Sequence, residues 1–278
     1  MQQFVRTRIA PTPSGYLHLG NVFSFAMTAM LARRHGARIL LRIDDLDKER
    51  VKREYVEDIF DTLDFLELPW DEGPKNYHDY QTVYSQVHRM ALYQDALSAL
   101  REKGAVFACE CSRSALLQEH PQGIYKGKCK DKGLSLEALG YNWRMLTPVG
   151  TLPPTMDYFV VRKKDGIPAY QLASLVDDVY YGVDLVVRGA DLWESTLAQR
   201  YLAELLGYGS FLAATCYHHA LLKADANEKL SKSAGATSIQ YLRTQGKHRR
   251  DIYALMGKML GLAYPITHWK DLKEEACR

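Results

Sequence analysis

Short apolar runs and longer, mostly apolar segments alternate along the N-terminal part of the chain. Residues 4–9 predict a strand, and residues 22–36 carry the pattern of a buried helix that ends near Gly36. Residues 37–45 (ARILLRIDD) form a compact apolar run that predicts a second buried strand. A strand, a loop, a helix and a strand make a βαβ unit, which implies a parallel sheet with a right-handed crossover. The second strand would deliver three acids to the sheet edge where such sheets bind ligands: Asp44, Asp45 and Asp47.

The pattern changes in the middle of the chain. Helical periodicity at residues 52–66 and 80–103 is followed by a region rich in cysteine and lysine, residues 105–155, which ends in the stretch TPVGTLPPT. We expect sheet structure to resume at residues 158–161, and residues 169–193 alternate helix and strand patterns. The prediction is an α/β fold built on a doubly wound, Rossmann-like parallel sheet. Its parts are residues 1–104 (first half of the domain), 105–155 (an insertion), 156–238 (second half) and 239–278 (a helical C-terminal portion).

Composition places the chain among ordinary globular proteins. Its 278 residues are 47% hydrophobic and 25% charged, no apolar run reaches the length of a membrane span, and the N-terminus lacks the apolar core of a signal peptide. We expect a cytoplasmic, monomeric protein without a membrane partner. The net charge of +3 and the basic groups at residues 126–132 and 247–250 suit either a solvated face or a polyanionic partner.

The loop after the first predicted strand, within RIAPTPSGYLHLGN from Arg8 to Asn21, has the composition of a phosphate site. Its prolines keep the backbone out of helix and sheet, and the helix that follows presents free N–H groups and a positive dipole end. Gly15 and Gly20 let the backbone approach a ligand closely, and His18 can donate a hydrogen bond to a phosphate oxygen. The same residues would also suit a proline-braced turn with a capping histidine.

A second motif, KLSKS at residues 229–233, lies in a polar stretch. Its lysines, Lys229 and Lys232, suit a loop that closes over a triphosphate. A lysine in such a loop neutralises charge on the transferred phosphorus and on the leaving pyrophosphate. Taken alone, the motif is also typical of a solvated loop.

Together these motifs resemble the HIGH and KMSKS signatures of class I aminoacyl-tRNA synthetases, and the segments RIDDLD, AYQLASLVDD and VVRGADL resemble the glutamyl/glutaminyl branch. The resemblance covers residues 5–240 and implies a nucleotide-binding domain that uses ATP and Mg²⁺. It implies that His18 and Lys232 are catalytic, stabilising the transition state without becoming covalently attached to the substrate. It also implies an ATP site formed by Ser14, Gly15, His18, Gly20, Asn21, Lys229, Ser231 and Lys232.

About 45 residues follow KLSKS, fewer than the helical anticodon-binding portion of full glutamyl-tRNA synthetases requires. In this respect the chain resembles the glutamyl-queuosine tRNA(Asp) synthetases. The resemblance implies that glutamate is activated with ATP, without tRNA, and is then transferred to the queuosine base in the anticodon stem-loop of tRNA(Asp). The alternatives are transfer to another acceptor (a tRNA 3′ end or a carrier) and a non-catalytic RNA-binding role. An HxGH nucleotidyltransferase would share the phosphate loop, but KLSKS and AYQLASLVDD argue against that class.

Three of the five cysteines lie close together in the predicted insertion. Cys109 and Cys111 form a CxC pair, and Tyr125 and Cys129 follow as YxxxC, a pattern that resembles the zinc site of these enzymes. The resemblance implies one structural Zn²⁺ ion on these four residues, because three thiolates and a phenolate offer a closed tetrahedral set of donors. Three reduced cysteines without metal are the alternative, since disulfides are not expected in a cytoplasmic chain.

The resemblance also implies a glutamate pocket. Arg8 would hold a substrate carboxylate through its guanidinium, and Asp44 would bind the substrate ammonium. Tyr170 and Arg188 match the tyrosine and the arginine of two family segments, although alone they would suit a core aromatic and a surface salt bridge. The predicted glutamate-binding residues are Arg8, Ala10, Thr12, Asp44, Tyr170 and Arg188.

Three positions depart from the family pattern. Asp44 stands where glutamate-specific relatives usually have Glu, Asn21 replaces the last histidine of HIGH, and Thr12 stands where Ser is usual. Asp44 retains a carboxylate, Asn21 retains a hydrogen-bond donor, and Thr12 retains a hydroxyl. The shorter reach of Asp44 is a methylene-scale change worth about 1–3 kcal/mol, so it can tune the substrate without dictating it.

Overall fold

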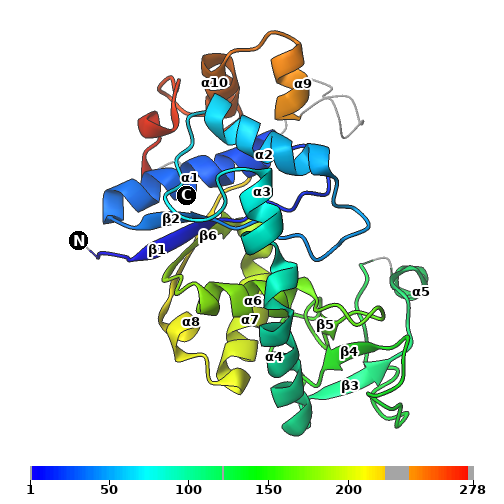
Figure 1. Ribbon diagram of the computed structural model, residues 1–278. Coiled ribbons are helices and arrows are strands. Elements are labelled where there is room, and N and C mark those ends of the chain that lie inside the picture. Colours follow the sequence, from blue (N-terminus) through cyan, green and yellow to red (C-terminus); the bar gives the residue numbers. More distant parts are fainter. Residues whose placement is uncertain (1, 121, 223–237, 275–278) are drawn as a thin grey trace. The chain divides into compact units, whose positions relative to one another are not determined.

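The computed structural model describes residues 2–120, 122–222 and 238–274 (Figure 1). The chain divides into two compact units. Unit 1 comprises residues 1–88, 183–191 and 214–278, and unit 2 comprises residues 89–182 and 192–213. The domain boundaries predicted from the sequence remain predictions.

Unit 1 is built on a parallel sheet of four strands in the order β2-β1-β6-β7. The strands are β1 (Arg6–Ile9), β2 (Arg38–Leu41), β6 (Leu185–Gly189) and β7 (Thr215–His219). Helix α1 (Leu19–His35) connects β1 to β2 and ends at Gly36, whose φ of 74° is the left-handed conformation that suits a glycine cap. The predicted βαβ unit and the α/β parallel-sheet fold are therefore confirmed.

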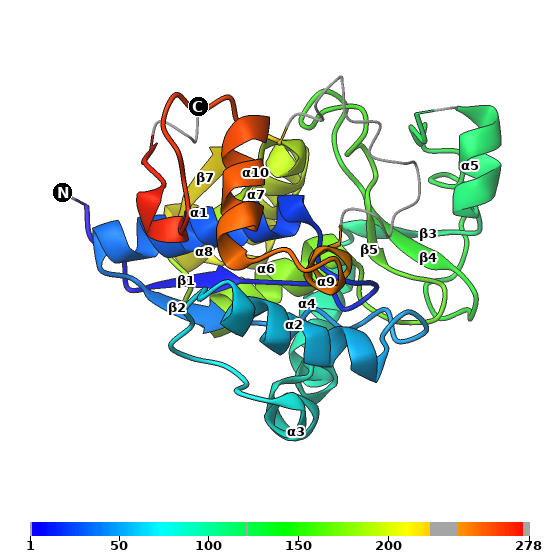
Figure 2. The ribbon, with the colours of Figure 1, turned by 90° about the horizontal axis from the view of Figure 1, so that it is seen from above.

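Helix α1 is buried on several sides because apolar residues surround most of its circumference. It contacts the sheet, and it also contacts α10 (Arg249–Met259) and the 3₁₀ turn η4 (Trp269–Asp271), as Figure 2 shows for α10. The C-terminal segment also contains α9 (Ile239–Thr244). The segment after β2 contains α2 (Arg53–Phe65) and the short α3 (Tyr77–Asp79). The C-terminal portion is thus helical, as predicted.

The helix predicted at residues 80–103 is interrupted at its start. A π-helical turn, η1 (Tyr80–Tyr84), and a 3₁₀ turn, η2 (Gln86–Arg89), precede α4 (Met90–Glu102). The buried carboxylate of Asp45 accepts hydrogen bonds from the hydroxyls of Tyr80 and Ser85 and from the backbone N–H of Gln86. These bonds hold Ser85 in an extended conformation, so a continuous α-helix cannot form there.

Unit 2 combines helices with an antiparallel sheet in the order β3-β4-β5. The strands are β3 (Val106–Cys109), β4 (Asn142–Met145) and β5 (Val160–Arg162). Sheet structure is predicted to resume at residues 158–161, but the strand begins only at Val160, and β5 pairs with β4 in this small sheet and not with the parallel sheet. The helical elements after β3 are α5 (Arg113–Glu119), α6 (Tyr170–Tyr180), η3 (Ala190–Leu192), α7 (Trp193–Leu206) and α8 (Gly209–Ala213).

A buried ion pair ties α6 to the chain before α4. The guanidinium of Arg89 donates to both carboxylate oxygens of Asp177, at 2.7 and 3.2 Å, and the hydroxyl of Tyr93 donates to the same carboxylate at 2.7 Å. Asp177 is fully buried, so these donors replace the water that the charge loses on folding. No helix in the described part of the chain is long and apolar enough to cross a membrane.

Candidate functional site

His18 is the N-cap of α1, which is the arrangement of the capping-histidine alternative. Its Nδ1 accepts hydrogen bonds from the backbone N–H groups of Gly20 and Asn21, at 3.1 and 3.4 Å, and the Oδ1 of Asn21 accepts from the backbone N–H of His18 at 3.1 Å. Partial desolvation of the ring lowers the pKa of His18. A neutral ring whose Nδ1 accepts must carry its proton on Nε2, so capping leaves one N–H donor free to face a ligand.

Gly20 explains the H-x-G spacing of the motif. A Cβ at this position would lie 3.1 Å from two atoms of the His18 ring, a tight contact that a larger residue would relieve only by shifting the ring a few tenths of an ångström. Gly15 meets no such neighbour, and both Ser14 and Gly15 are half-buried in the loop. The absence of a side chain at Gly20 therefore leaves room for the His18 ring to cap α1 at the end of the predicted phosphate loop.

The KLSKS residues of the predicted ATP site, Lys229, Ser231 and Lys232, lie outside the described residues. The described chain resumes at Ser238, which forms an isolated β-bridge with His18. The next residue, Ile239, donates its backbone N–H to the carbonyl of Leu17 at 2.7 Å. Ser238 and Ile239, a few residues after KLSKS, thus lie beside the histidine of the first motif.

The carboxyl ends of β1 and β2 bring several predicted glutamate-binding residues together. Hydrogen bonding continues beyond β2, because the backbone N–H of Asp44 donates to the carbonyl of Pro11 at 2.9 Å. Asp44 therefore lies beside the stretch from Ala10 to Thr12. Ala10 is half-buried and Thr12 is exposed. A ligand at this end of the sheet could therefore contact both the backbone of Ala10 and the accessible hydroxyl of Thr12.

Two arginines are buried on the central strands. Arg8 on β1 is 5% exposed and donates to the carbonyl of Val187 on β6 at 3.2 Å, next to Arg188. Arg188 is 3% exposed. This burial excludes the alternative interpretation, in which Arg188 would form a salt bridge on the protein surface. It pairs in register with His218 on β7. Burial of His218, followed by the charges of Arg188 and His219, lowers the pKa of His218 to about 4, so this ring is neutral near pH 7.

The three acids after β2 have different surroundings. Both oxygens of Asp44 accept from the guanidinium of Arg42, which is 2% exposed. Asp45 is the buried anchor of η1 and η2, and Asp47 is exposed. Of the three, Asp44 has the position and the partial exposure that a substrate ligand needs. The role of Arg42 was not predicted, although its spacing of two residues from Asp44 in an extended segment places both side chains on one face.

Tyr170 belongs to unit 2, whereas the other predicted glutamate-binding residues belong to unit 1. It is the first residue of α6 and its side chain is 44% exposed, so it is not a core aromatic. Exposure leaves its ring and hydroxyl accessible to a ligand.

The predicted metal ligands lie together in unit 2. The Sγ atoms of Cys109, Cys111 and Cys129 are all within 4.8 Å of one another, and those of Cys111 and Cys129 are 3.6 Å apart. Tetrahedral Zn–S bonds of about 2.3 Å place sulfur atoms about 3.8 Å apart, so this spacing fits zinc. The buried hydroxyl of Tyr125 accepts from the backbone N–H of Cys129 at 2.7 Å, which places the fourth predicted donor beside the thiols. Among the described residues, this is the one cluster of three or more cysteine, histidine or acidic side chains whose potential ligand atoms lie this close together.

Arg144 on β4 adds a positive charge to this cluster. Its Nε lies 3.3 Å from the Sγ of Cys109, and its guanidinium carbon lies 4.0 Å from the centroid of the Tyr125 ring. Arg144 is 6% exposed, and its Nη1 donates to the carbonyl of Tyr158 at 2.9 Å. Thiolate ligands of a zinc ion at this cluster would place negative charge beside the buried guanidinium and so offset part of the cost of burying it. The arrangement therefore suits a cluster that carries negative charge, as a zinc–thiolate centre does.

The basic groups found in the sequence are partly ion-paired. Lys128 pairs with Glu119 and Lys132 pairs with Glu110, which agrees with a solvated face in that part of the chain. In the C-terminal group, Arg249 pairs with Glu67.

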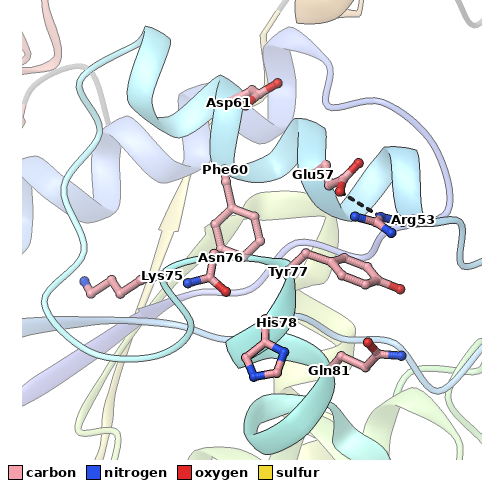
Figure 3. A pocket seen from close by; sticks show the side chains of 9 residues that line it. All are labelled: Arg53, Glu57, Phe60, Asp61, Lys75, Asn76, Tyr77, His78 and Gln81. Atoms are coloured by element: carbon pink, nitrogen blue, oxygen red, sulfur yellow. Dashed lines mark hydrogen bonds and ion pairs between the residues drawn. The ribbon is translucent and has the colours of Figure 1, made fainter.

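A pocket that the sequence did not indicate lies in unit 1, between α2 and the segment from Lys75 to Gln81 (Figure 3). Its volume is about 650 Å³. None of the residues predicted to bind glutamate, ATP or metal lines it. Its side chains come from two separate segments and follow no known motif, so no local pattern could have identified it.

Comparison with known proteins gives a consistent set of relatives. A family model described as "tRNA synthetases class I (E and Q), catalytic domain" matches residues 4–138 and 146–265. A glutamyl-Q tRNA(Asp) synthetase of Rhodobacter capsulatus is 32% identical, with the match covering 90% of this chain and 99% of the relative. One from Synechococcus is 38% identical over 91% of this chain and 81% of the relative.

Longer proteins match in the same region. Glutamate–tRNA ligase 2 of Syntrophus aciditrophicus is 32% identical, but the match covers only 58% of that protein and 92% of this chain. The crystal structure of a glutamate tRNA ligase from Elizabethkingia meningosepticum superimposes with a TM-score of 0.67 at 26% identity, covering 83% of this chain and 52% of that one. The chain thus spans about half the length of that solved structure.

Proposed function

Because this chain belongs to the class I tRNA synthetases of the E and Q branch, we propose that it activates glutamate with ATP and transfers the glutamyl group to queuosine in the anticodon of tRNA(Asp). The observation that best supports activation is the His18 cap, which presents an Nε2–H donor and a helix N-terminus at one place. The acceptor is supported by matches along 99% and 81% of two relatives that carry the corresponding name.

Glutamate would bind at the carboxyl ends of β1 and β2. Asp44 would accept hydrogen bonds from its ammonium group, and Arg8 and Arg188 would pair with its carboxylates. The backbone of Ala10, the hydroxyl of Thr12 and the accessible ring of Tyr170 would complete the contacts. Because Arg42 already holds the Asp44 carboxylate in one orientation, little further ordering is needed when the ammonium group arrives.

In the first step, an α-carboxylate oxygen of glutamate attacks the α-phosphorus of ATP in line, and the bond to pyrophosphate breaks. His18 Nε2–H, the positive end of the α1 dipole and Lys232 would stabilise the charge on the phosphate oxygens. Mg²⁺, when bound to the phosphates, neutralises part of this charge. Ser14, Gly15, Gly20, Asn21, Lys229 and Ser231 would position the nucleotide.

In the second step, a hydroxyl of the queuosine cyclopentene-diol attacks the carbonyl carbon of glutamyl-adenylate and AMP leaves. Both steps depend on positioning and electrostatics rather than on a covalent enzyme intermediate. One zinc ion on Cys109, Cys111, Tyr125 and Cys129 would have a structural role, because four protein donors leave no open position for a substrate.

The test measures the two steps separately. Glutamate-dependent exchange of pyrophosphate into ATP, without tRNA, is expected for activation. Labelled glutamate should then transfer to tRNA from cells that make queuosine and not to tRNA from cells that lack it. Labelling that ignores queuosine would favour the 3′ end of a tRNA as acceptor, which the 32% identity to a glutamate–tRNA ligase keeps as the second candidate. Absence of exchange would contradict glutamate activation itself.

A further inference from the structure

The pocket between α2 and the segment from Lys75 to Gln81, here called the α2–α3 pocket, has two flat surfaces. The guanidinium carbon of Arg53 lies 4.7 Å from the centroid of the Tyr77 ring, and its Nε donates to Glu57 at 2.8 Å (Figure 3). The ion pair with Glu57 holds the guanidinium over the ring. Phe60, which is 7% exposed, adds an apolar ring to the lining. Unpaired nucleobases stack on aromatic rings and on guanidinium planes of this kind.

Polar groups at the same pocket can contact the edge of a planar ligand. The Oδ1 of Asn76 caps α3 by accepting from the backbone N–H of Asp79 at 2.9 Å, so its amide nitrogen is the atom left for a ligand. The amide of Gln81 and the ring of His78 also line the pocket. Amides of this kind both donate and accept hydrogen bonds, as the edges of nucleobases do.

The charges favour a neutral ligand over a phosphate group. Two cations, Arg53 and Lys75, and two carboxylates, Glu57 and Asp61, line the pocket, so their formal charges cancel. Lys75 is engaged in part, because its Nζ donates to the carbonyl of Trp70 at 2.9 Å. The pocket has no net positive charge that could stabilise a bound polyphosphate. An uncharged heterocycle does not require a charge of opposite sign in order to bind.

The wall of the pocket is attached to the end of β2 and to the residues that follow this strand. Before the pocket, the carbonyl of Glu72 accepts from Leu41 of β2 at 2.9 Å, and the neighbouring Gly73 has a φ of 98°. A Cβ on Gly73 would come within 2.2 Å of the Leu41 carbonyl oxygen, so this close approach requires glycine. After the pocket, Asp45 holds the π-helical turn through Tyr80. π-helical turns are rare and are often found at functional sites.

We propose that the α2–α3 pocket binds one unpaired nucleobase of the RNA acceptor. The assignment rests on the proposed function only in taking RNA as the acceptor. Asp45, which anchors the pocket wall, directly follows Asp44 in the chain, so the pocket and the proposed glutamate site are built on the same strand end. An unpaired base held here would fix the position of the RNA relative to that site.

The test compares Tyr77→Ala with Tyr77→Phe, which keeps the aromatic face. Binding is measured by fluorescence anisotropy with a synthetic tRNA(Asp) anticodon stem-loop and with a tRNA(Asp) transcript, and glutamate-dependent pyrophosphate exchange is measured in parallel. Tyr77→Ala should weaken RNA binding about ten-fold while exchange stays at the wild-type level, and Tyr77→Phe should bind as the wild type does. Gln81→Ala, an exposed residue whose loss should not affect folding, should weaken binding in the same direction.

Wild-type affinity in both Tyr77→Ala and Gln81→Ala, or no RNA binding by the wild-type protein, would overturn the assignment. Equal weakening of binding and exchange in Tyr77→Ala, with a lowered melting temperature, together with unchanged binding in Gln81→Ala, would also overturn it, because that result indicates a structural role. A wild-type protein that binds RNA but shows no exchange contradicts the proposed function instead, and the binding comparison still decides the pocket.

Discussion

The guanidinium of Arg42 and the carboxylate of Asp44 form a two-pronged ion pair, with Nε 2.7 Å from Oδ1 and Nη2 3.0 Å from Oδ2. The Arg42 side chain is 1% exposed and that of Asp44 is 11% exposed. The pair is formed by residues two apart in the chain, and it fixes the orientation of the partly exposed Asp44 carboxylate. Arg42 is therefore a positioning residue for the proposed ammonium contact.

Asp44→Asn should impair glutamate binding more than catalysis. The substitution removes the charge that attracts the ammonium group, and charged hydrogen bonds of this type contribute about 1.5–3 kcal/mol, so the KM for glutamate in pyrophosphate exchange should rise about 10- to 100-fold. It also leaves Arg42 buried beside a neutral amide, which should lower the free energy of unfolding. The matched control is Asp47→Asn, an exposed acid of the same segment, which should change neither quantity. A wild-type KM in Asp44→Asn would exclude the ammonium role.

The two roles of His18 can be separated by substitution. Asn is a good N-cap, so His18→Asn should keep α1 capped and the melting temperature close to that of the wild type, but it lacks the Nε2–H donor. Pyrophosphate exchange should fall by about 10²–10³-fold, the usual effect of losing one transition-state donor. His18→Ala should lose both the donor and the cap, with about 1 kcal/mol of stability. If His18→Asn retains wild-type exchange, the histidine is a cap and nothing more.

Stability should depend on the protonation of His218. Its pKa is lowered to about 4 in the folded protein, by burial first and then by the charges of Arg188 and His219, whereas an unfolded histidine titrates near the ordinary value of 6.5. Between these values the unfolded chain binds more protons, so stability is fully present above about pH 6.5 and declines as the pH falls towards 4. The decline due to this group should reach about 3 kcal/mol, because each pKa unit between the folded and the unfolded value corresponds to about 1.4 kcal/mol. Denaturant unfolding of His218→Gln over this pH range should show a correspondingly flatter profile; a profile identical to that of the wild type would refute the assignment.

Metal content should follow the cysteine cluster. The purified protein should contain about one zinc ion per chain, and a chelator should lower its melting temperature, since structural zinc contributes directly to folding. Cys111→Ala should reduce the zinc content strongly, because three donors bind far more weakly than four. Cys216→Ser on β7 lies outside the cluster and should retain full zinc content. Mass spectrometry of the intact protein and elemental analysis distinguish these outcomes, and equal metal content in the two variants would argue against the site.

Arg144 should control how tightly the metal is held. Arg144→Met keeps much of the side-chain volume but removes the charge beside Cys109 and the cation over the Tyr125 ring. Zinc transfer to a colorimetric chelator should be about ten-fold faster, in line with the usual effect of losing an outer-shell partner. Arg144→Lys should have an intermediate rate, because a lysine keeps the charge without the planar fork. A transfer rate in Arg144→Met equal to that of the wild type would show that the cluster does not depend on this charge.

The sequence by itself determined the βαβ unit, the course of α1 and the family. These depend on the spacing of apolar residues, on a glycine at a helix end and on motifs of a few adjacent residues, all of which are local properties. The cysteine spacing likewise indicated that Cys109, Cys111 and Cys129 would lie together, because they lie within a short segment. The glutamate, ATP and zinc contacts assigned to individual residues from the family resemblance remain predictions, and those of Lys229, Ser231 and Lys232 lie outside the described residues.

The tertiary structure decided which residue of each motif faces a ligand and which holds the fold together. The three acids after β2 look alike in sequence, yet Asp45 anchors η1 and η2 some forty residues away while Asp44 stays accessible. Arg188 is buried because β6 lies between β1 and β7, and β5 joins the small antiparallel sheet because β4 offers it a free edge. The α2–α3 pocket exists only because α2 and the segment from Lys75 to Gln81, which are separate in the chain, lie close together. Such relationships join residues far apart in the chain, so their energies depend on packing that no local pattern records.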